Sequence, residues 1–329
     1  MIGAAVVGLG VGEAHARTYA EDPRAELRWV LDLDRERAER VAAELGARAA
    51  RDLDEILADG AVGAVSIASF DDAHYAQALA ALRGGRNVLV EKPLCRTVEE
   101  ARELKAAWEQ AGRPVLASNL VLRGAPLYEW LRAQLDAGSL GVPYAFDGDY
   151  LYGRLAKITE GWRAGVDDYS VLLGGGVHLV DLMLWTTGQR PVRVSAAGNR
   201  ISTEGTAFRY LDFAAATFEF ESGLVGRITA NFGSVHPHQH VVRVFGTQAT
   251  FVHDDAGARL HESRDPAEAP RRLDAAALPG TKGVLVPAFL AAIESGDSGG
   301  AQHELDVICA CAAADRALFE GAVVDVDYV

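Results

Sequence analysis

The chain has 329 residues, of which 49% are hydrophobic and 24% are charged. This balance is typical of a globular protein with a real core, and the length allows one large domain or two ordinary ones. The formal net charge of −14 argues against a nucleic-acid-binding protein, which needs a basic surface. An acidic protein can still hold an anionic small molecule in a local basic pocket.

The first third of the chain alternates short apolar runs with helical patterns. Strands are predicted at residues 4–7, 27–31, 64–67, 87–90 and 115–117, and helices at residues 13–20, 35–45, 53–58, 73–83 and 98–111. Such alternation predicts a parallel, doubly wound sheet. The apolar start has no basic segment and runs directly into a glycine motif, so we interpret it as the first strand and not as a signal peptide.

The pattern changes after about residue 120. A helix is predicted at residues 126–137, followed by longer alternating runs at 144–152, 192–201, 211–221, 224–232, 240–245 and 250–253. Ser222 and Gly223 form the expected turn of a hairpin. The polar stretch 254–279 is predicted to be a loop or edge region, and residues 302–319 a final helix. Residues 121–329 are therefore expected to form an α+β domain with a large, mostly antiparallel, open-faced sheet.

The three cysteines, Cys95, Cys309 and Cys311, show neither a disulfide framework nor a CxxC zinc pair. Their pattern favours a reducing compartment, so we expect a cytoplasmic protein. No apolar run approaches the roughly 20 residues of a membrane span, so no membrane partner is expected.

A glycine motif, Gly8-Leu9-Gly10-Val11-Gly12, follows the first strand and opens a helix. Glycines allow a tight turn and a close approach of the backbone to a pyrophosphate, and the helix N-terminus attracts its charge. Asp32 follows the second strand, where a carboxylate takes the ribose hydroxyls and repels a 2′-phosphate. The α/β region 1–120 is thus predicted to be a dinucleotide-binding (Rossmann) domain that prefers NAD to NADP.

Glu91, Lys92 and Pro93 follow the apolar strand at residues 87–90. An ammonium group at the end of a buried strand must find partners or lose its proton. Its position between a carboxylate and a ring-locked residue indicates a fixed proton donor rather than a solubilising charge.

These pieces together resemble the glucose–fructose oxidoreductase / inositol dehydrogenase (Gfo/Idh/MocA) family. The resemblance spans nearly the whole chain, and its pieces fall in family order. Besides the glycine motif with His15, Asp32 and the Glu91-Lys92-Pro93 element, the matching pieces are Ser69 to His74, Gly84-Gly85, Asn119 with Arg123, Gly138 to Gly141, and the run Gly174-Gly175-Gly176-Val177-His178-Leu179-Val180-Asp181.

The family resemblance implies an NAD(P)-dependent sugar or cyclitol dehydrogenase. Lys92 would lie beside the nicotinamide and bind a substrate oxygen, and His178 would be the acid/base of hydride transfer. Asp181, one turn beyond His178, could orient its imidazole or could cap or pair elsewhere. The resemblance also implies a homodimer or homotetramer formed through an apolar face of the C-terminal sheet. The implied cofactor-binding residues are Gly8, Gly10, Val11, Gly12, Asp32, Ser69, His74, Glu91 and Lys92.

Two positions depart from the family pattern. Many members place an Asp four residues before the histidine, and here that residue is Gly174, so another acid such as Asp167 or Asp168 would have to replace it. The turn after the third nucleotide-binding strand is Ser69-Phe70-Asp71 rather than the usual TPN-like turn. This turn can keep its backbone role while its side-chain contact to the ribose differs.

Cations and aromatics gather between residues 150 and 163, a connection that borders the substrate pocket in the family. Such side chains suit an anion together with a sugar ring face, which favours a uronate, a sugar phosphate or a nucleotide sugar over a neutral polyol. The alternative is a solvated loop. The substrate-binding candidates are Lys92, Asn119, Arg123, Tyr152, Arg154, Lys157, Trp162, Arg163 and His178.

His236, His238 and His240 alternate along a predicted strand, which is chelating geometry. No Cys or acidic cluster accompanies them, so we predict no metal and favour a role at the pocket rim or in a subunit contact. Two other functions compete with a dehydrogenase: NAD-assisted glycoside cleavage, and a catalytically silent NAD-binding regulator. The presence of both Lys92 and His178 argues against the silent regulator.

Overall fold

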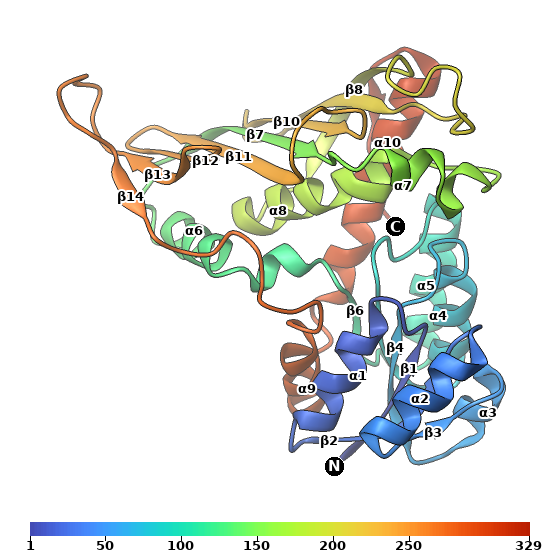
Figure 1. Cartoon of the computed structure of the whole chain (residues 1–329). Helices are drawn as coiled ribbons and strands as arrows, with labels where there is room; N and C mark the ends of the chain where they lie inside the picture. Colours follow the sequence, from blue (N-terminus) through green and yellow to red (C-terminus); the bar gives the residue numbers. More distant parts are fainter. The chain divides into compact units, whose positions relative to one another are not determined.

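The computed structural model describes residues 1–329, which form two compact units (Figure 1). The first unit comprises Met1–Gly124, Pro279–Ile308 and Val329, and the second comprises Ala125–Leu278 and Cys309–Tyr328. The sequence predicted a single boundary at residue 120. In the structure the chain enters the second unit after Gly124 and returns to the first for residues 279–308, so each unit is assembled from separate segments.

The first unit contains a six-stranded parallel sheet in the order β3-β2-β1-β4-β5-β6, as the alternating pattern predicted. This is the strand order of a dinucleotide-binding fold, which binds its ligand where the order reverses, here between β1 and β4. The strands are β1 (Ile2–Val7), β2 (Ala25–Leu31), β3 (Arg48–Ala49), β4 (Val62–Ile67), β5 (Asn87–Val90) and β6 (Leu116–Ser118). The connecting helices are α1 (Gly12–Glu21), α2 (Arg35–Leu45), α3 (Leu53–Ala58), α4 (His74–Arg83), α5 (Val98–Gln110) and the 3-10 turn η1 (Val121–Gly124).

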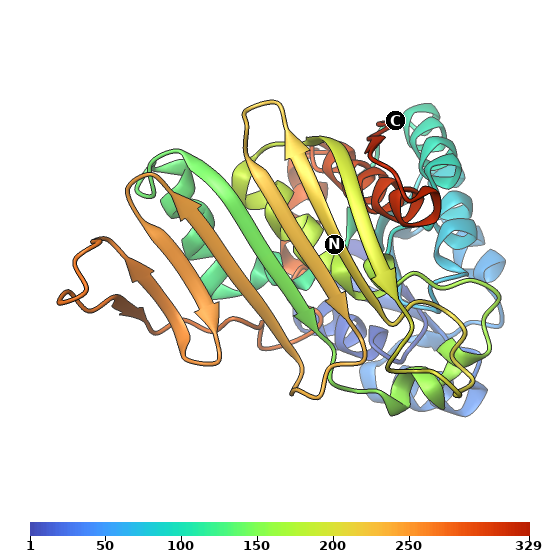
Figure 2. The same ribbon diagram turned by 90° about the horizontal axis from the view of Figure 1, so that it is seen from above.

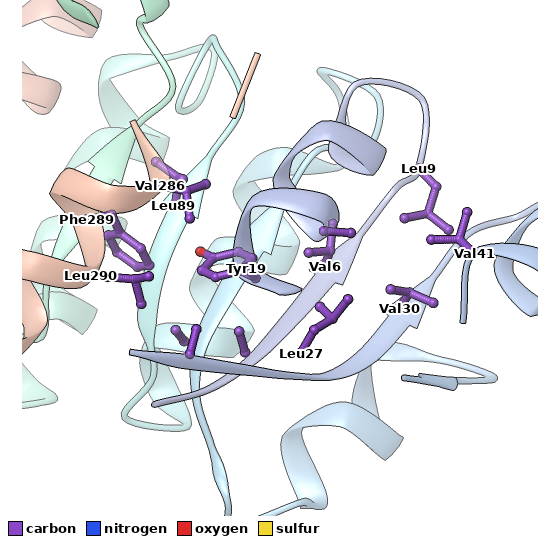
Figure 3. Packing of buried hydrophobic residues seen from close by; sticks show 14 of the residues in the cluster. Val6, Leu9, Tyr19, Leu27, Val30, Val41, Leu89, Val286, Phe289 and Leu290 are labelled. Carbon is purple, nitrogen blue, oxygen red and sulfur yellow. The ribbon is translucent and has the colours of Figure 1, made fainter. Parts of the chain in front are cut away.

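The core of the first unit includes a helix that the sequence pattern did not reveal, α9 (Val286–Ser295). Its Phe289 and Leu290 are buried in one cluster with Tyr19 of α1 and Leu89 of β5 (Figure 3). Because α9 lies almost 200 residues after β5 in the chain, no local pattern places it on this sheet.

The second unit contains a nine-stranded sheet in the order β14-β13-β12-β11-β7-β10-β9-β8-β15. Only β7 and β10 pair in parallel, which confirms a mostly antiparallel sheet. The predicted loop or edge region supplies β13 and β14 at one edge. The strands are β7 (Pro143–Leu151), β8 (Pro191–Asn199), β9 (Phe213–Phe220), β10 (Val225–Asn231), β11 (Gln239–Gly246), β12 (Thr250–Asp254), β13 (Gly257–His261), β14 (Arg271–Leu273) and β15 (Val324–Asp325).

The two faces of this sheet differ. Helices α6 (Pro126–Asp136) and α8 (Val177–Thr187) cover one face, on which Phe146 and Phe218 are fully buried, whereas Figure 2 shows the other face without a covering helix. The uncovered face carries ion pairs from Arg227 to Asp147 (2.9 Å) and from Arg243 to Asp149 (3.3 Å). The expectation of an apolar face left over is therefore wrong, because charged cross-strand neighbours occupy its centre.

The remaining helical segments are α7 (Ala156–Thr159), the 3-10 turn η2 (Trp162–Ala164), the π-helical turn η3 (Leu172–Gly176) and α10 (Ala301–Glu320). Helix α10 confirms the predicted final helix; it begins in the first unit and ends in the second. None of the helices combines the length and the hydropathy that a membrane crossing requires.

Candidate active site

The glycine loop of the first unit is shaped by contacts at the β1–β4 switch point. Gly8 has φ +84°, and a Cβ there would lie 2.4 Å from the Ala68 carbonyl oxygen. A Cβ at Gly12 would lie 2.9 Å from side-chain carbons of Val6 and Ala68, so Gly12 lets α1 pack closely on the sheet. Gly12 thus has the packing role of the third glycine of a dinucleotide-binding motif, although the spacing GxGxG differs from GxGxxG.

The tip of this loop is open. Gly10 and Val11 are exposed, and a Cβ at Gly10 would have no neighbour within 4 Å. No side chain caps the N-terminus of α1, so its first N–H groups are available to an anion, and the helix dipole favours one there. The loop therefore fits a pyrophosphate, the part of NAD(P) that this type of loop holds.

Asp32 lies at the end of β2 beside the glycine loop. Its Oδ2 accepts a hydrogen bond from the Leu9 amide (2.6 Å), and its Oδ1 accepts one from the Asp34 amide (2.8 Å). The guanidinium of Arg37 lies 3.8 Å from Oδ2. Each carboxylate oxygen has a second lone pair, so Asp32 can hold the loop and still accept a ribose hydroxyl.

His74 links two loops at the carboxyl ends of β4 and β5. Its ring is buried, and its Nδ1 and Nε2 lie 2.7 Å from the Pro93 oxygen and 3.2 Å from the Ser69 oxygen. Ser69 itself donates its hydroxyl to Gln77 (2.7 Å). Both side chains were predicted to bind cofactor. Their contacts support the turns that follow β4 and β5, and their role in cofactor binding stays a prediction.

Glu91, which immediately precedes Lys92, is buried in a polar network. Its Oε1 accepts a hydrogen bond from Asn119 Nδ2 (2.6 Å) and lies 3.5 Å from His15 Nε2. Burial raises the pKa of Glu91, but the His15 ring, the Asn119 amide and the Lys92 charge outweigh burial, and the net pKa is lowered. The carboxylate therefore stays ionised next to the Lys92 ammonium.

Asn119 and Arg123 were predicted to bind substrate, and both have partners within the first unit. Asn119 is fully buried and donates to Glu91 and to the Lys282 carbonyl oxygen (2.9 Å). Arg123 forms two hydrogen bonds with the buried Glu304 of α10 (2.6 and 3.0 Å). Both side chains therefore help to hold the first unit together, and their role in substrate binding stays a prediction.

His178 lies in the first turn of α8 in the second unit and is 8% exposed. Its ring belongs to an aromatic cluster with Tyr150 (6.3 Å between ring centres) and His240 (5.7 Å). Tyr150 also contacts Tyr152 and His238 (6.1 and 5.3 Å). Burial raises the pKa of Tyr150 well above its usual range, so its hydroxyl keeps its proton.

The sequence analysis placed Tyr150 in the connection that borders the substrate pocket and His240 at a pocket rim or subunit contact, but it linked neither residue to His178. The signal was the alternation of β7 and β11, which turns these residues toward the helix-covered face of the sheet. His236 and His238 also have partners: the Asp255 carboxylate for His236 (3.2 Å) and the Leu151 carbonyl oxygen for His238 (3.1 Å).

The glycine run before His178 is explained by two tyrosines. A Cβ at Gly174 would lie 2.1 Å from the Tyr169 hydroxyl oxygen, and one at Gly175 would lie 2.3 Å from Cε1 of Tyr150. The π-helical turn η3, which ends two residues before His178, therefore presents bare backbone to two aromatic rings. Turns of this kind are frequent at functional sites.

The cationic and aromatic residues of the 150–163 connection have different environments. Arg163 donates to the Tyr169 hydroxyl (2.9 Å) and lies over the Trp162 ring (4.5 Å). Arg154 is exposed and lies 5.7 Å from the centre of the Tyr152 ring, and Lys157 is exposed on α7. Arg154 and Lys157 thus remain as solvent-facing cations, while Arg163 braces an aromatic side chain.

Asp181 is fully buried on α8. The pKa of Cys311 on α10 is raised by burial first and then by the charges of Asp315, Asp181 and Cys309. Asp181 thus lies near enough to Cys311 to act on its charge, and its role toward the imidazole of His178 stays a prediction. None of the three cysteines forms a disulfide.

Comparison with known proteins identifies the family. A model described as "Oxidoreductase family, NAD-binding Rossmann fold" matches residues 2–118, and one described as the GFO/IDH/MocA C-terminal domain matches residues 128–252. The chain belongs to the GFO/IDH/MocA family. Its first unit is therefore an NAD-binding Rossmann fold of the oxidoreductase type, and its second carries the C-terminal domain of the family.

Two relatives of this GFO/IDH/MocA protein are dehydrogenases. Inositol 2-dehydrogenase 2 of Saccharopolyspora erythraea is 34% identical over 58% of this chain and 55% of its own length. UDP-N-acetylglucosamine 3-dehydrogenase of Acidithiobacillus ferrooxidans is 34% identical over 69% of this chain and 66% of its own length. The matched regions thus span less than two thirds of either relative.

Solved structures of the GFO/IDH/MocA type match over almost the whole chain. The structure of the same UDP-N-acetylglucosamine 3-dehydrogenase has a TM-score of 0.80 and 26% identity, and covers 97% of this chain and 98% of its own. A levoglucosan dehydrogenase in complex with NADH has a TM-score of 0.87 over 100% of both chains at 20% identity, which shows the shared fold.

Proposed function

We propose that the protein is an NAD-dependent oxidoreductase that transfers a hydride between nicotinamide and a carbinol or carbonyl carbon of a sugar or cyclitol. The observation that carries this proposal is the uncapped N-terminus of α1, open at Gly10 and Val11 and flanked by Asp32, in a chain of an oxidoreductase family. The names of the two dehydrogenase relatives, one of an inositol and one of a nucleotide sugar, support a ring alcohol as substrate.

Bound NAD would supply the hydride acceptor. In our proposal His178 accepts the proton of the substrate hydroxyl as its carbon loses the hydride, and returns a proton in the reverse direction. Lys92 donates a hydrogen bond to the same oxygen and stabilises its developing charge. A well-placed acid/base contributes roughly 100- to 10,000-fold to the rate. The ionised Glu91 fixes the charge environment of Lys92.

We infer a preference for NAD over NADP from Asp32. Its carboxylate holds the Leu9 amide and offers lone pairs to ribose hydroxyls, and it would repel a 2′-phosphate. The Arg37 guanidinium lies 3.8 Å from this carboxylate. The positive charge of Arg37 is therefore partly compensated by Asp32.

We infer further that an anionic group of the substrate is bound by Arg154 and Lys157. Both side chains are exposed: Arg154 lies next to Tyr152, and Lys157 lies on the following helix, α7. Tyr152 offers a ring face that suits a sugar. A uronate, a sugar phosphate or a nucleotide sugar would use both features, whereas a neutral cyclitol would use only the rings.

The uncovered face of the second sheet is our candidate for a homodimer or homotetramer contact. An open face that carries both Arg and Asp side chains can be complementary to the same face of a second copy. Light scattering on the wild type and on Arg227→Glu tests this: the variant should dissociate. A wild-type mass of one chain, or a variant of unchanged mass, contradicts the contact.

The function is tested by following NADH absorbance with NAD and a panel of myo-inositol, scyllo-inositol, levoglucosan, methyl β-D-glucuronide and UDP-N-acetylglucosamine. At least one compound should be oxidised, and Lys92→Met and His178→Asn should each lower kcat/KM by about 100-fold or more. Lys105→Met and His261→Asn are the matched controls and should retain activity. The proposal fails if no compound is oxidised or if the two site variants keep wild-type rates.

The same panel separates the competing functions. Aryl glycosides are added, because release of the phenol that requires NAD but yields no net NADH indicates NAD-assisted glycoside cleavage. Tight NAD binding without any turnover indicates a silent regulator. Calorimetry with NAD and NADP measures the cofactor preference independently of the substrate.

A further inference from the structure

The hydroxyl of Tyr169 occupies the space that a side chain at position 174 would fill. A Cβ added to Gly174 would lie 2.1 Å from the Tyr169 oxygen and 2.6 Å from its Cζ. Gly174 is in η3, four residues before His178. The phenol therefore reaches the helix at a fixed place relative to the proposed acid/base.

The Tyr169 hydroxyl lies on the helix face from which the His178 side chain projects. Residues four apart on a helical segment share a face, and helical side chains lean toward the N-terminus. The imidazole of His178 is thus directed over the turn that holds Gly174, where the phenol lies. Tyr150, packed on Gly175 and against His178 (6.3 Å between ring centres), fills the adjoining position.

Tyr169 is held rigidly enough to act as a binding group. Arg163 donates its Nε–H to the phenol oxygen (2.9 Å). The ring contacts Phe208 and Phe232 edge-on (5.7 and 6.1 Å between centres). Fixed aromatic contacts and a charged donor pre-organise the hydroxyl, which lowers the entropy lost when a ligand binds.

We propose that Tyr169 is a further substrate-binding residue, whose hydroxyl binds the ring hydroxyl next to the one that His178 deprotonates. The site would thereby select a vicinal diol, the arrangement that sugars and cyclitols share. This inference rests on the proposed function. The cation of Arg163, by donating to the phenol oxygen, polarises the phenol O–H toward the substrate oxygen.

The test removes the Tyr169 hydroxyl and the neighbouring substrate hydroxyl, separately and together. Rates are measured for wild type and Tyr169→Phe with myo-inositol and its monodeoxy analogues, and with methyl β-D-glucuronide and its monodeoxy analogues. In wild type, loss of the neighbouring hydroxyl should lower kcat/KM by about tenfold, as should Tyr169→Phe with the full compound. The two losses should not add, because each removes the same hydrogen bond.

Tyr210→Phe is the matched control. Tyr210 lies in the same aromatic cluster (6.5 Å from the Tyr169 ring), and its hydroxyl donates to the Val166 carbonyl oxygen. This variant should keep the wild-type kcat/KM and the wild-type ratio between each compound and its deoxy analogue. The proposal is overturned if Tyr169→Phe keeps wild-type kcat/KM, or if its loss adds fully to that of the deoxy analogue.

A second measurement needs no substrate. The imidazole ¹⁵N signals of His178, assigned by their absence in His178→Asn, should shift in Tyr169→Phe and stay unchanged in Tyr210→Phe. Unshifted signals in Tyr169→Phe would contradict the placement of the phenol beside His178. If no panel compound is turned over but the His178 signals shift in Tyr169→Phe, the proposed oxidoreductase function is rejected and the placement of the phenol is retained.

Discussion

Asn119 and Glu91 are joined by a hydrogen bond of 2.6 Å in the interior of the first unit, and Glu91 immediately precedes Lys92 in the chain. The amide comes from the segment after β6 and the carboxylate from the segment after β5. Both lie at the carboxyl edge of the parallel sheet, where a dinucleotide-binding fold places its ligand. The bond therefore fixes the backbone that carries the lysine.

Replacing Glu91 with Gln should destabilise the protein at pH 7 by about 1–3 kcal/mol, because it removes a buried ionised group with specific partners. The lowered pKa of Glu91 means that its contribution is present above the unfolded value near 4.5 and is lost as pH falls through the folded pKa. The difference between wild type and variant should therefore shrink below pH 4.5. Urea unfolding at several pH values measures it.

Glu55→Gln is the control for this prediction, because Glu55 also has a lowered pKa but lies at the surface beside Arg51. It should change the unfolding midpoint much less. Equal effects of the two variants would show that the buried network adds nothing to the stability of the first unit.

Asp32→Asn should shift the ratio of NAD to NADP affinities toward NADP by about tenfold or more, since removing the negative charge relieves repulsion of a 2′-phosphate. It also removes one of the two carboxylates beside Arg37. The ratio is the decisive quantity, because damage to the Leu9 contact weakens both cofactors alike. Asp34→Asn keeps a good cap for α2 and should leave the ratio unchanged. A parallel decrease in both affinities would assign Asp32 to loop support alone.

Two glycines of the cofactor loop should respond in opposite ways to alanine. Gly10→Ala adds a Cβ into open space, so stability should hold while NAD affinity falls by about tenfold through a lost close approach. Gly12→Ala forces a Cβ against Val6 and Ala68 at 2.9 Å and should cost about 1–3 kcal/mol of stability. Thermal unfolding and calorimetry with NAD measure the two effects; the reverse pattern would refute the assignment of their roles.

Because Asp315 is buried, the free energy of unfolding should fall as pH rises toward neutrality. Burial, with the charge of Asp168 added, raises the pKa of Asp315 to about 7, although Ser170 donates a hydrogen bond to it. The folded protein then binds a proton that the unfolded chain releases near 3.8, so stability declines between about pH 4 and pH 7 by up to about 4 kcal/mol.

Asp315→Asn keeps the acceptor oxygen for Ser170 and removes the ionisation. The variant should be more stable than wild type at pH 8 and nearly equal to it at pH 4.5. Asp327→Asn, which removes an exposed partner of Arg316, serves as the control. A wild-type pH profile in Asp315→Asn would contradict the raised pKa.

The Arg123–Glu304 pair gives a test of the substrate role first expected for Arg123. Arg123→Met should cost about 3–5 kcal/mol, because it leaves the buried Glu304 without its cation. The double variant Arg123→Met/Glu304→Leu should recover much of this loss. If it also retains the wild-type KM for the best panel compound, Arg123 is structural; a KM raised tenfold in the double variant would support the predicted role of Arg123 in the substrate site.

Much of the fold followed from the sequence because its signals are local. The alternation of strands and helices in residues 1–118 predicted the parallel sheet, and the period-two runs after residue 140 predicted the antiparallel one. Two elements were not predicted. Strand β3 has only two residues, and helix α9 has no side-chain N-cap and begins with a Pro-containing turn after a polar stretch. The sequence of α9 carries too little periodicity to distinguish a helix from a buried loop.

The sequence by itself determined the glycine loop, Asp32, Lys92 and His178 as candidate residues, because backbone turns and strand ends depend on neighbouring residues. Only the tertiary structure decided what surrounds them. It packed Tyr150 of β7 against Gly175 of η3, joined Arg123 to Glu304 across 181 positions, and returned residues 279–308 to the first unit. Such contacts depend on how whole elements pack, and packing between distant segments leaves no periodic trace in the chain.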